Sequence, residues 1–332
     1  MMKALICSSP GNGSALRIGE LPIPQPKSHE IRIKTHFAGI NYPDVLIIED
    51  RYQLRPPRPF SPGIEIAGVI DAVGVDVDWA EAGQPCVALL RYGGLAEFAV
   101  APAEAVAPIP GGLDIAEAAS VVISHGTSWH ALRDRANLRQ GDTLLVLGAS
   151  GVVGQAAVQL GKALGTRVVA SVSSLEKARA AEANGADNVV LYPVGDVGDR
   201  QLATLFKEAC GTEGATCIFD PVGGRYGEAA LRALAWQGRY LVVGFASSLP
   251  NFAANLILLK SAELLGVSWG ETVSRKPGMF RRHMAEIGEL VEKGAIDPKP
   301  TTIIPLEKAG DAIEALAART AFGKTIVQIK QS

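Results

Sequence analysis

An uninterrupted apolar run followed by a glycine-spaced turn lies near the middle of the chain. Residues 144–147 are apolar without alternation, which is typical of a strand buried on both faces of a parallel sheet. Residues 152–164 then carry apolar side chains at helical spacing, and a second β-branched run follows at 167–172. The pattern predicts a strand, a tight turn, a helix and a second strand.

The pattern of apolar and polar positions changes near residue 121. Before it, residues 31–35 alternate apolar and charged side chains, as a half-exposed strand does, and 64–73 and 85–90 are further predicted strands. Prolines crowd residues 55–62, which we expect to form a loop. After it, strands alternate with helices: the further strands are predicted at 188–191, 216–220, 240–243 and 263–267, with helices at 175–184 and 200–210.

The last part of the chain changes character again after about residue 270. Two amphipathic helices are predicted at 277–293 and 306–318, and a last strand at 325–330. We therefore predict an α/β protein in which a doubly wound domain interrupts a β-rich one. The predicted boundaries place residues 1–122 and 271–332 in the β-rich domain and residues 123–270 in a dinucleotide-binding domain.

The glycine turn carries the first candidate chemistry. It reads G-A-S-G-V-V-G rather than the strict G-x-G-x-x-G, but its glycines still allow a tight turn, a close approach of the backbone to a pyrophosphate, and close packing of helix and strand. The free N–H groups of the following helix would face the phosphates. A membrane span over residues 143–161, which carry no charge, is the alternative; the glycines and the polar Ser150, Gln155 and Gln159 argue against it. The candidate contacts are Gly148, Ser150, Gly151, Val152, Val153 and Gly154.

Composition adds bounds. A chain of 332 residues suggests about two domains. A net charge of −2 gives no electrostatic reason to expect nucleic acid or an anionic membrane as a partner. The cysteines are scattered without a C-x-x-C pair, which suits a reducing compartment, and we expect a cytoplasmic protein without a signal peptide.

Several motifs resemble the medium-chain dehydrogenase/reductase superfamily, in its zinc-free quinone oxidoreductase branch, and the resemblance runs nearly end to end. They are AGINYPDVLIIEDRYQ (38–53), PFSPGIEIAGVI (59–70), the GASGVVG turn, ASVSSLEKA (170–178), GAD (185–187), FDPVGG (219–224), GRYLVVGF (238–245), LLKSAELLGVSWG (258–270) and GKTIVQI (323–329). The resemblance implies a Rossmann domain and a β-rich, GroES-like substrate domain, with NADPH in the cleft between them.

Departures from the zinc-dependent members of that superfamily are informative. Those members carry a cysteine where this chain has Gly-Ile-Asn at 39–41, and G-H-E where it has G-I-E at 63–65. An isoleucine cannot bind zinc. His125 and His130, five apart, and His29 and His36, seven apart, do not form a site by spacing. We expect no metal, which disfavours alcohol oxidation through a metal alkoxide.

The end of the second strand bears on the choice of cofactor. NAD-binding folds place an Asp or Glu ~20 residues after the glycine turn, whereas this chain has A-S-V-S-S at 170–174. Ser173, Ser174 and, one helical turn later, Lys177 can receive a 2′-phosphate, although Glu176 lies nearby. The alternative is an ordinary helix N-cap with a solvated lysine. The resemblance adds Tyr192 and Arg319 to this patch. The expected cofactor is NADPH.

A second group of residues, in the first domain, is the candidate for the reaction itself. In the relatives that the chain resembles, the segment with Asn41, Asp44 and Tyr52 faces the nicotinamide. Asn41 would bind a substrate carbonyl oxygen, and Tyr52 would orient the substrate or pass a proton. Asp44 is expected to brace the loop. For each residue the alternative is a side chain that only stabilises the turn.

The resemblance also implies contacts farther along the chain. Thr127 resembles the residue that contacts the nicotinamide-side phosphate, although it would equally suit the cap of a helix beginning there. Gly244, Phe245 and Val267 resemble the loops that bind the carboxamide face, with Phe245 alternatively a core residue.

The leading hypothesis is an NADPH-dependent, zinc-free reductase that transfers hydride to a small electrophilic acceptor, first of all a quinone. The close alternative is reduction of the double bond of an enone, a 2-alkenal or an acyl thioester, because in this branch the cofactor supplies the chemistry and the pocket positions. A protein that binds NADPH for a structural or sensing role, with little turnover, is an alternative of another class. Apolar strand character at 235–265 and the resemblance together suggest a homodimer, with a tetramer open.

Overall fold

The computed structural model describes residues 1–192 and 198–329, and the chain divides into two compact units. The Rossmann unit comprises Ser124–Trp269 and Lys293–Asp297. The β-rich unit comprises Met1–Ile123, Gly270–Glu292 and the described residues from Pro298 on. The sequence places the crossings at 122/123 and 270/271; the structure has them after residues 123 and 269, and assigns 293–297 to the Rossmann unit as well.

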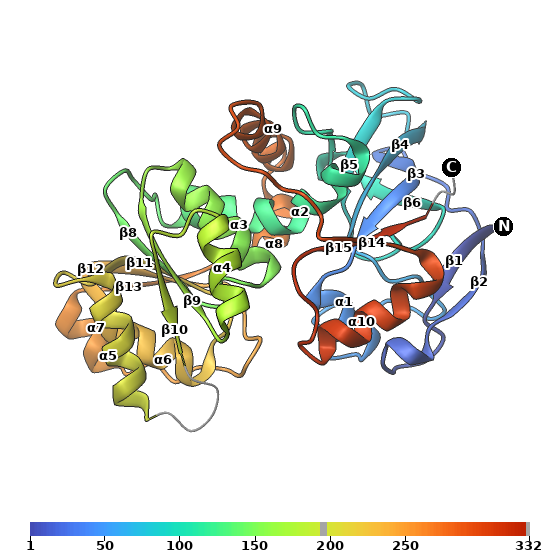
Figure 1. The fold of residues 1–332 in the computed structure, drawn as a ribbon. Helices are drawn as coiled ribbons and strands as arrows, with labels where there is room; N and C mark the ends of the chain where they lie inside the picture. The colour runs from blue at the N-terminus through green and yellow to red at the C-terminus, as the bar shows by residue number, and fades with distance from the viewer. Residues whose placement is uncertain (193–197, 330–332) are drawn as a thin grey trace. The chain divides into compact units, whose positions relative to one another are not determined.

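The Rossmann unit is built on a parallel sheet in the order β10-β9-β8-β11-β12-β13 (Figure 1). All neighbouring strands in it pair in parallel. The chain order reverses between β8 and β11, so the carboxyl ends of these two strands flank the point where doubly wound sheets bind their ligands. The strands are β8 (Thr143–Val146), β9 (Arg167–Val172), β10 (Asn188–Leu191), β11 (Ala215–Asp220), β12 (Leu234–Val242) and β13 (Glu263–Gly266).

Helices cover both faces of this sheet, with α3 and α4 on one side and α5 and α7 on the other in Figure 1. The central strands are buried over most of their length, as their apolar runs predict. Leu145, Val169, Ile218 and Tyr240 from four neighbouring strands share one core with Phe206. The helices of this unit are the π-helix η3 (His130–Arg135), α3 (Val152–Ala163), α4 (Leu175–Ala183), α5 (Asp199–Cys210), α6 (Gly224–Ala233) and α7 (Ala254–Lys260). The boundary between the units falls within α2 (Ile115–Trp129), and α8 (Trp269–Arg275) belongs to the β-rich unit except for its first residue.

The β-rich unit centres on a mixed sheet in the order β14-β15-β3-β4-β5-β7, with β6 also paired to β3. The long strand β3 (Glu30–Gly39) pairs antiparallel with β4 (Glu65–Val73) and with β15 (Thr325–Gln328), so a strand from the last part of the chain joins a sheet built mainly from its first third. The other elements are the β1 (Met2–Ile6) and β2 (Arg17–Leu21) hairpin, β5 (Pro85–Leu89), β6 (Phe98–Pro102), β7 (Val106–Pro108), β14 (Thr302–Pro305), α1 (Tyr42–Ile48), α9 (Met279–Glu292), α10 (Ala309–Ala317) and the 3₁₀ turns η1 (Gly13–Ala15), η2 (Ala103–Ala105) and η4 (Leu306–Lys308).

The predicted fold class is confirmed, and among the strands that the sequence predicts the largest difference in bounds is at β12. The sequence predicts this strand from residue 240, whereas it begins at Leu234. Gln237 has a positive φ of 55° and is followed by a glycine, so the first half of the strand is irregular and pairs with β11 only through a register shift. A polar residue and a glycine in that position hide the strand from an apolar-run search.

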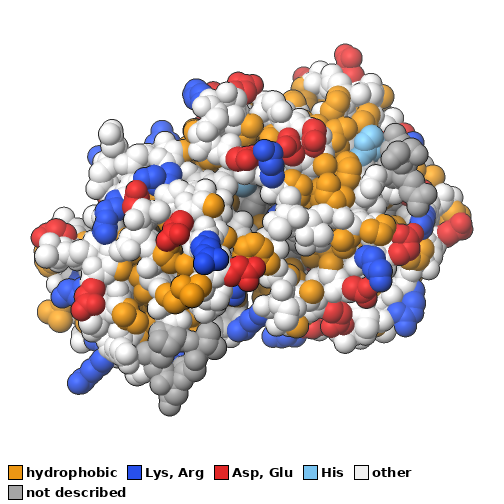
Figure 2. All heavy atoms as spheres, in the orientation of Figure 1, with side chains coloured by type: hydrophobic (Ala, Val, Ile, Leu, Met, Phe, Trp, Pro, Cys, Tyr) orange, Lys and Arg blue, Asp and Glu red, His pale blue; other side chains and the backbone are white. Residues whose placement is uncertain are grey.

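The surface carries both signs of charge. Figure 2 shows Lys and Arg side chains interspersed with Asp and Glu on the face it draws, without a large area of one sign. Within the described residues, no helix combines the length and the apolar character that crossing a membrane requires.

Candidate functional site

The glycine turn connects β8 to α3. It lies at the carboxyl end of β8, next to the point between β8 and β11 where the strand order of the sheet reverses. Gly148 has a positive φ of 58°, and the N–H of Gly151 donates to its carbonyl oxygen at 2.9 Å. A Cβ at position 154 would overlap the Gly148 carbonyl and would lie 2.9 Å from the Cα of Ala149. Gly151 is the N-cap of α3. The turn is therefore tight. The first turn of α3 packs directly on the backbone that follows β8, because Gly154 has no side chain to separate them.

The helix start is suited to an anion. The first N–H groups of a helix have no partner within it, and the helix dipole adds positive potential there. In α3 these groups belong to Val152, Val153 and Gly154. The side chain of Gln155 donates to the Ser150 carbonyl at 2.9 Å, which braces the turn in this shape. A pyrophosphate fits this arrangement.

A second polar cluster follows the next strand. The ammonium of Lys177 lies 3.2 Å from the hydroxyl of Ser173, and Tyr192, which follows β10, makes a side-chain hydrogen bond with the same serine. The Tyr192 ring also packs on Tyr226, with centroids 5.0 Å apart. Ser174 caps α4 instead, accepting from the backbone N–H of Lys177 at 3.3 Å. The structure thus brings Ser173, Lys177 and Tyr192 together and uses Ser174 as a helix cap.

The expected cofactor contacts in the Rossmann unit meet at one edge of the sheet. The carboxyl ends of parallel strands lie on the same side, and the glycine turn, Ser173, Tyr192, Gly244 with Phe245, and Val267 follow β8, β9, β10, β12 and β13 in turn. Phe245 is 47% exposed, so its alternative interpretation as a core residue is wrong. Thr127 lies inside α2, two residues from its end, so the alternative that it caps a helix beginning there is also wrong. Arg319 belongs to the β-rich unit, with a positive φ of 60°.

Sequence reasoning missed a buried pair beside the glycine turn. Asp220 ends β11, and one of its carboxylate oxygens accepts from the N–H groups of Val222 and Gly223, each at 2.8 Å. The other oxygen accepts from the hydroxyl of Tyr240 at 2.7 Å, and burial raises the pKa of the Asp220 carboxyl. This pair fixes the turn after β11, the strand next to β8. The signal was present as the FDPVGG motif, which the sequence analysis used only for the resemblance.

In the β-rich unit, Asn41 and Asp44 shape the start of α1. One carboxylate oxygen of Asp44 accepts from the backbone N–H of Asn41 at 2.8 Å, and the other accepts from the N–H of Gly63 at 3.1 Å. Asp44 therefore ties the helix start to the loop before β4 and braces it, as expected. Tyr52 lies shortly after α1, half-buried, and packs against the apolar core of this unit.

Glu65 and Lys324 complete a buried polar network that the sequence analysis did not foresee. The ammonium of Lys324 pairs with Glu65 and donates to the Asn41 side-chain oxygen at 2.8 Å. The Asn41 amide donates to Glu65 at 2.8 Å and, more weakly, to the Gly39 carbonyl at 3.3 Å. The second Glu65 oxygen accepts from the N–H of Ile123 at 2.7 Å. Glu65 has 0% and Lys324 5% of its surface exposed, so both charges depend on these partners.

The pKa values of this network follow from burial. Burial raises the pKa of Asp44 from 3.8 to about 7, against the two backbone N–H groups and Lys324, which lower it. Glu65 and Tyr52 are the other ionisable groups whose charges interact with it. Burial also raises the pKa of Tyr52, and the charge of Asp44 raises it further. The Tyr52 hydroxyl is therefore protonated at neutral pH and available as a donor.

Asp44 predicts a specific dependence of stability on pH. Its pKa is higher in the folded chain than in the unfolded one, so the folded state binds more protons between about pH 4 and about pH 7. The contribution of Asp44 to the free energy of unfolding is present at low pH. It is lost as the pH rises through this window, by up to about 1.4 kcal/mol per pH unit. Asp44→Asn cannot ionise. Its melting temperature relative to the unsubstituted protein should therefore rise from about pH 5 to about pH 8 in thermal unfolding scans.

The matched control for this experiment is Asp76→Asn, an exposed aspartate of the same unit. Its melting curve should follow that of the unsubstituted protein across the pH range. Parallel pH dependences for Asp44→Asn and the unsubstituted protein would show that Asp44 stays ionised in the fold.

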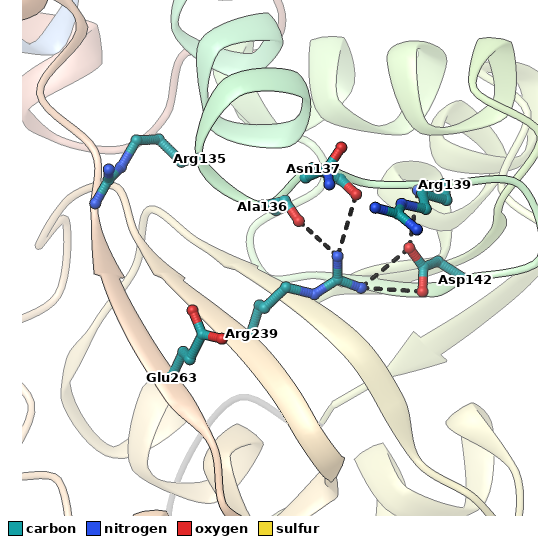
Figure 3. A pocket seen from close by; sticks show the side chains of 7 residues that line it. All are labelled: Arg135, Ala136, Asn137, Arg139, Asp142, Arg239 and Glu263. Atoms are coloured by element: carbon teal, nitrogen blue, oxygen red, sulfur yellow. Dashed lines mark hydrogen bonds and ion pairs between the residues drawn. The ribbon is translucent and has the colours of Figure 1, made fainter.

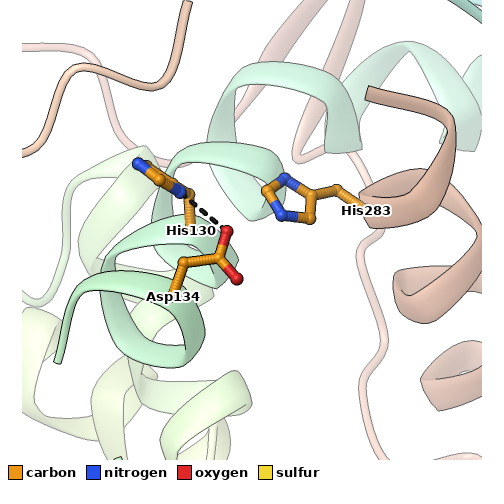
Figure 4. A group of neighbouring side chains, drawn as sticks. All are labelled: His130, Asp134 and His283. Carbon is orange, nitrogen blue, oxygen red and sulfur yellow. Dashed lines mark hydrogen bonds and ion pairs between the residues drawn. The ribbon is translucent and has the colours of Figure 1, made fainter. Parts of the chain in front are cut away.

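A histidine–carboxylate pair lies in the Rossmann unit. On η3, His130 Nδ1 and a carboxylate oxygen of Asp134 are 2.9 Å apart (Figure 4). The spacing of four residues puts both side chains on one face of the helix. His283, also drawn there, belongs to α9 of the other unit. His130 was considered as a zinc ligand only with His125, and the structure gives it a carboxylate partner instead.

A cavity of about 390 Å³ opens in the Rossmann unit away from the glycine turn (Figure 3). Arg239 donates to both carboxylate oxygens of Asp142 at 3.0 Å and to the carbonyls of Ala136 and Asn137. Asp142 precedes β8 and Glu263 begins β13, so the cavity lies at the amino ends of the strands. The residues that line the cavity are Arg135, Ala136, Asn137, Arg139, Asp142, Arg239 and Glu263. None of them is an expected cofactor contact, and the Arg239 guanidinium is already bound to groups of the protein itself.

Two family models match the chain. Residues 27–111 match the alcohol dehydrogenase GroES-like domain, and residues 152–287 match a model described as zinc-binding dehydrogenase. The second match begins after Asn41 and Ile64, the positions at which the chain departs from zinc-dependent sequences.

Known proteins resemble the chain along nearly its whole length. Quinone oxidoreductase-like protein 2 of Bos taurus is 33% identical over 310 residues, which are 92% of this chain and 87% of the bovine protein. A mycobacterial protein solved in complex with NADPH is 30% identical and superposes with a TM-score of 0.90 over 99% of this chain and all of that one. A quinone oxidoreductase from Pseudomonas syringae is 25% identical, with a TM-score of 0.89 over 99% of this chain and 100% of its own.

Proposed function

Because the chain belongs to the medium-chain dehydrogenase/reductase superfamily, in its quinone oxidoreductase branch, we propose that it is an NADPH-dependent reductase of small electrophilic acceptors. Quinones are the proposed acceptors. The overall change is quinone plus NADPH plus a proton to hydroquinone plus NADP⁺. Family membership supports the class of reaction, and the side chains described above support the choice of cofactor.

The observation that carries the proposal is the cluster of Ser173, Lys177 and Tyr192. It presents an ammonium and two hydroxyl groups after β9 and β10, and residues 170–174 contain no carboxylate to repel a phosphate. A 2′-phosphate would be held there by charge-assisted hydrogen bonds. The NADPH complex of the mycobacterial relative is consistent with this choice.

The remaining contacts follow from the same sheet edge. The N–H groups at the start of α3 would bind the pyrophosphate, with Gly148 and Gly151 shaping the turn. Gly244, Phe245 and Val267 would hold the carboxamide, while Thr127 and Arg319 would contact phosphates. When bound, NADPH supplies the hydride from C4 of its nicotinamide.

In the β-rich unit, Tyr52 and Asn41 are the proposed acceptor contacts. The half-buried, protonated hydroxyl of Tyr52 can donate a hydrogen bond or a proton. The Asn41 amide has two short hydrogen bonds and a longer one to the Gly39 carbonyl, at 3.3 Å. The longer one is the bond that an acceptor oxygen would replace.

Two other functions compete, and one experiment separates them. Reduction of an enone, 2-alkenal or acyl thioester would place hydride on the β-carbon and a proton on the α-carbon. A binding or sensing protein would take up NADPH without turnover. The test is NADPH consumption, followed by absorbance, against a panel of quinones, enones, alkenals and enoyl-CoA esters. Fast consumption with quinones supports the proposal, preference for activated alkenes supports the second function, and binding without consumption supports the third.

We also expect the reaction to be independent of zinc. Asn41 and Ile64 stand where the zinc-dependent members of the superfamily carry cysteine and histidine, and isoleucine offers no ligand atom. Elemental analysis of the purified protein should find well under one zinc per chain, and chelator treatment should leave turnover unchanged. Stoichiometric zinc whose removal abolishes turnover would contradict this expectation, and the His130–Asp134 pair would then be the first place to look.

A homodimer is part of the proposal, with a tetramer open. β13 is an edge strand of the sheet, and an edge strand can pair with a second copy; its Gly266 carbonyl already accepts from the Arg135 side chain at 3.0 Å. Trp236, in the neighbouring strand β12, and Leu258 and Leu259, in α7 just before β13, are 66–79% exposed, and a second copy would bury such apolar side chains. The four cysteines are buried and unpaired, which is consistent with the proposed cytoplasmic location.

A further inference from the structure

The network around Asn41 contains a charge whose purpose the reaction leaves unexplained. Lys324 is 95% buried, and its ammonium donates to three acceptors: the Glu65 carboxylate, the Asn41 side-chain oxygen at 2.8 Å and the Ile40 carbonyl at 3.4 Å. Burying an ammonium is costly, and an apolar residue would fill the space without that cost. The network therefore has to be explained by what its charges do to Asn41.

The two charges determine which way the Asn41 amide faces. An ammonium can only donate hydrogen bonds and a carboxylate can only accept them. With Lys324 on one side and Glu65 on the other, the amide oxygen must face Lys324 and the NH₂ group must face Glu65. A flipped amide would put two donors together and two acceptors together. The second N–H is left with the Gly39 carbonyl at 3.3 Å, the weakest bond of the group.

Backbone geometry supports a site built for this arrangement. A Cβ at position 39 would overlap the carboxylate of Glu65, so the glycine there lets the carboxylate approach β3. Glu65 is also held from its other oxygen by the Ile123 N–H at 2.7 Å. The carboxylate is thus fixed on two sides before Asn41 is considered.

We infer that Lys324 is a positioning residue, which together with Glu65 locks the Asn41 carboxamide so that its second N–H can be exchanged from Gly39 to an acceptor oxygen. This inference rests on the proposed function, because it takes Asn41 as a contact of the acceptor. Lys324 acts through Asn41 and does not itself contact the acceptor or the cofactor.

A double-mutant cycle tests the inference. Lys324→Met, Asn41→Ala and the double variant are compared with the unsubstituted protein in NADPH oxidation by 1,4-benzoquinone. Loss of orientation should lower kcat by up to about 100-fold in Lys324→Met, while the Kd for NADPH, measured by fluorescence, stays unchanged. Because Lys324 acts through Asn41, the double variant should be no slower than the slower single variant. Losses that multiply would overturn the inference.

Two further variants separate positioning from stability. Lys324→Met leaves the Glu65 carboxylate buried without its cation, so part of any loss can come from unfolding. The variant Lys324→Met/Glu65→Gln removes both charges. Its melting temperature should recover toward that of the unsubstituted protein, while its kcat stays low because the amide is no longer held. Lys34→Met, at an exposed lysine of β3, is the control and should change neither quantity.

The outcomes distinguish the inference from the proposed function. Recovery of kcat in Lys324→Met/Glu65→Gln, or an unchanged kcat in Lys324→Met, would overturn the inference and leave the proposed function standing. An unsubstituted protein that oxidises NADPH with none of the acceptors of the panel would overturn the proposed function and the inference together.

Discussion

Replacing Tyr52 by phenylalanine should lower the turnover of an enone by about 10²–10⁴-fold, the loss typical of a missing general acid. The substitution keeps the ring, which packs against the core of the β-rich unit, and removes only the hydroxyl. Burial and the charge of Asp44 raise the pKa of this hydroxyl, so it carries its proton at neutral pH. After hydride reaches the β-carbon of an enone, that proton would go to the α-carbon, and water would reprotonate the tyrosine.

Quinone turnover should fall much less in the same variant, because water can protonate the oxyanion of a hydroquinone. The measurement is kcat for one enone and one quinone, together with the Kd for NADPH, which should barely change. Tyr92→Phe removes a hydroxyl from a more exposed tyrosine of the same unit and serves as the control. If Tyr52→Phe keeps its full rate with every accepted substrate, the Tyr52 hydroxyl donates no proton, and only the ring can contribute, by contact with the substrate.

Most of the Rossmann unit could be predicted from the sequence because its signals are local. The central strands are buried on both faces and are therefore mostly apolar without alternation, as in residues 144–146 of β8 and residues 168–170 of β9. The shape of the glycine turn can be predicted from its own sequence, because the glycines stand where the backbone requires them: Gly148 has a positive φ, and position 154 has no room for a Cβ. Strand β12 shows the limit: its irregular first half, around Gln237, has no such run.

The polar network of the β-rich unit could be predicted only in part. Asn41 and Asp44 are three residues apart at a helix start, where a local pattern suffices. Glu65 and Lys324 are separated by 259 residues and meet because β15 and β4 both pair with β3. Nothing near Lys324 in the sequence indicates a buried carboxylate partner. The antiparallel register of three strands decides this contact, and a residue-by-residue search cannot reach it.

The alternative roles of Thr127 as a helix cap and of Phe245 as a core residue are both wrong. Thr127 lies inside a helix and not at its start, because α2 begins twelve residues earlier, at Ile115. Phenylalanine is among the residues most often buried, which makes a core position the alternative for Phe245. Phe245 instead follows β12 and is 47% exposed, at the edge of the sheet where the proposed cofactor contacts lie.

Lys177→Ala should weaken the binding of NADPH far more than the binding of NADH. The ammonium lies 3.2 Å from the Ser173 hydroxyl, in the cluster proposed for the 2′-phosphate. A lost charge-assisted hydrogen bond is worth roughly 1.5–3 kcal/mol, so the Kd for NADPH should rise on the order of 10- to 150-fold. NADH has no phosphate at this position, and its Kd should stay nearly constant. Fluorescence titration with both cofactors measures the two effects.

Arg179→Ala is the matched control, because Arg179 is an exposed cation two residues farther along the same helix. If the selectivity came from the general positive potential near α4, both variants would lose NADPH affinity to a similar extent, and added salt would reduce the difference from NADH. If it comes from the contact with Lys177, only Lys177→Ala loses it. Equal losses of NADPH and NADH affinity in Lys177→Ala would show that this lysine supports the fold of the cluster and does not recognise the phosphate; Ser173 and Tyr192 would then be left as the residues to substitute.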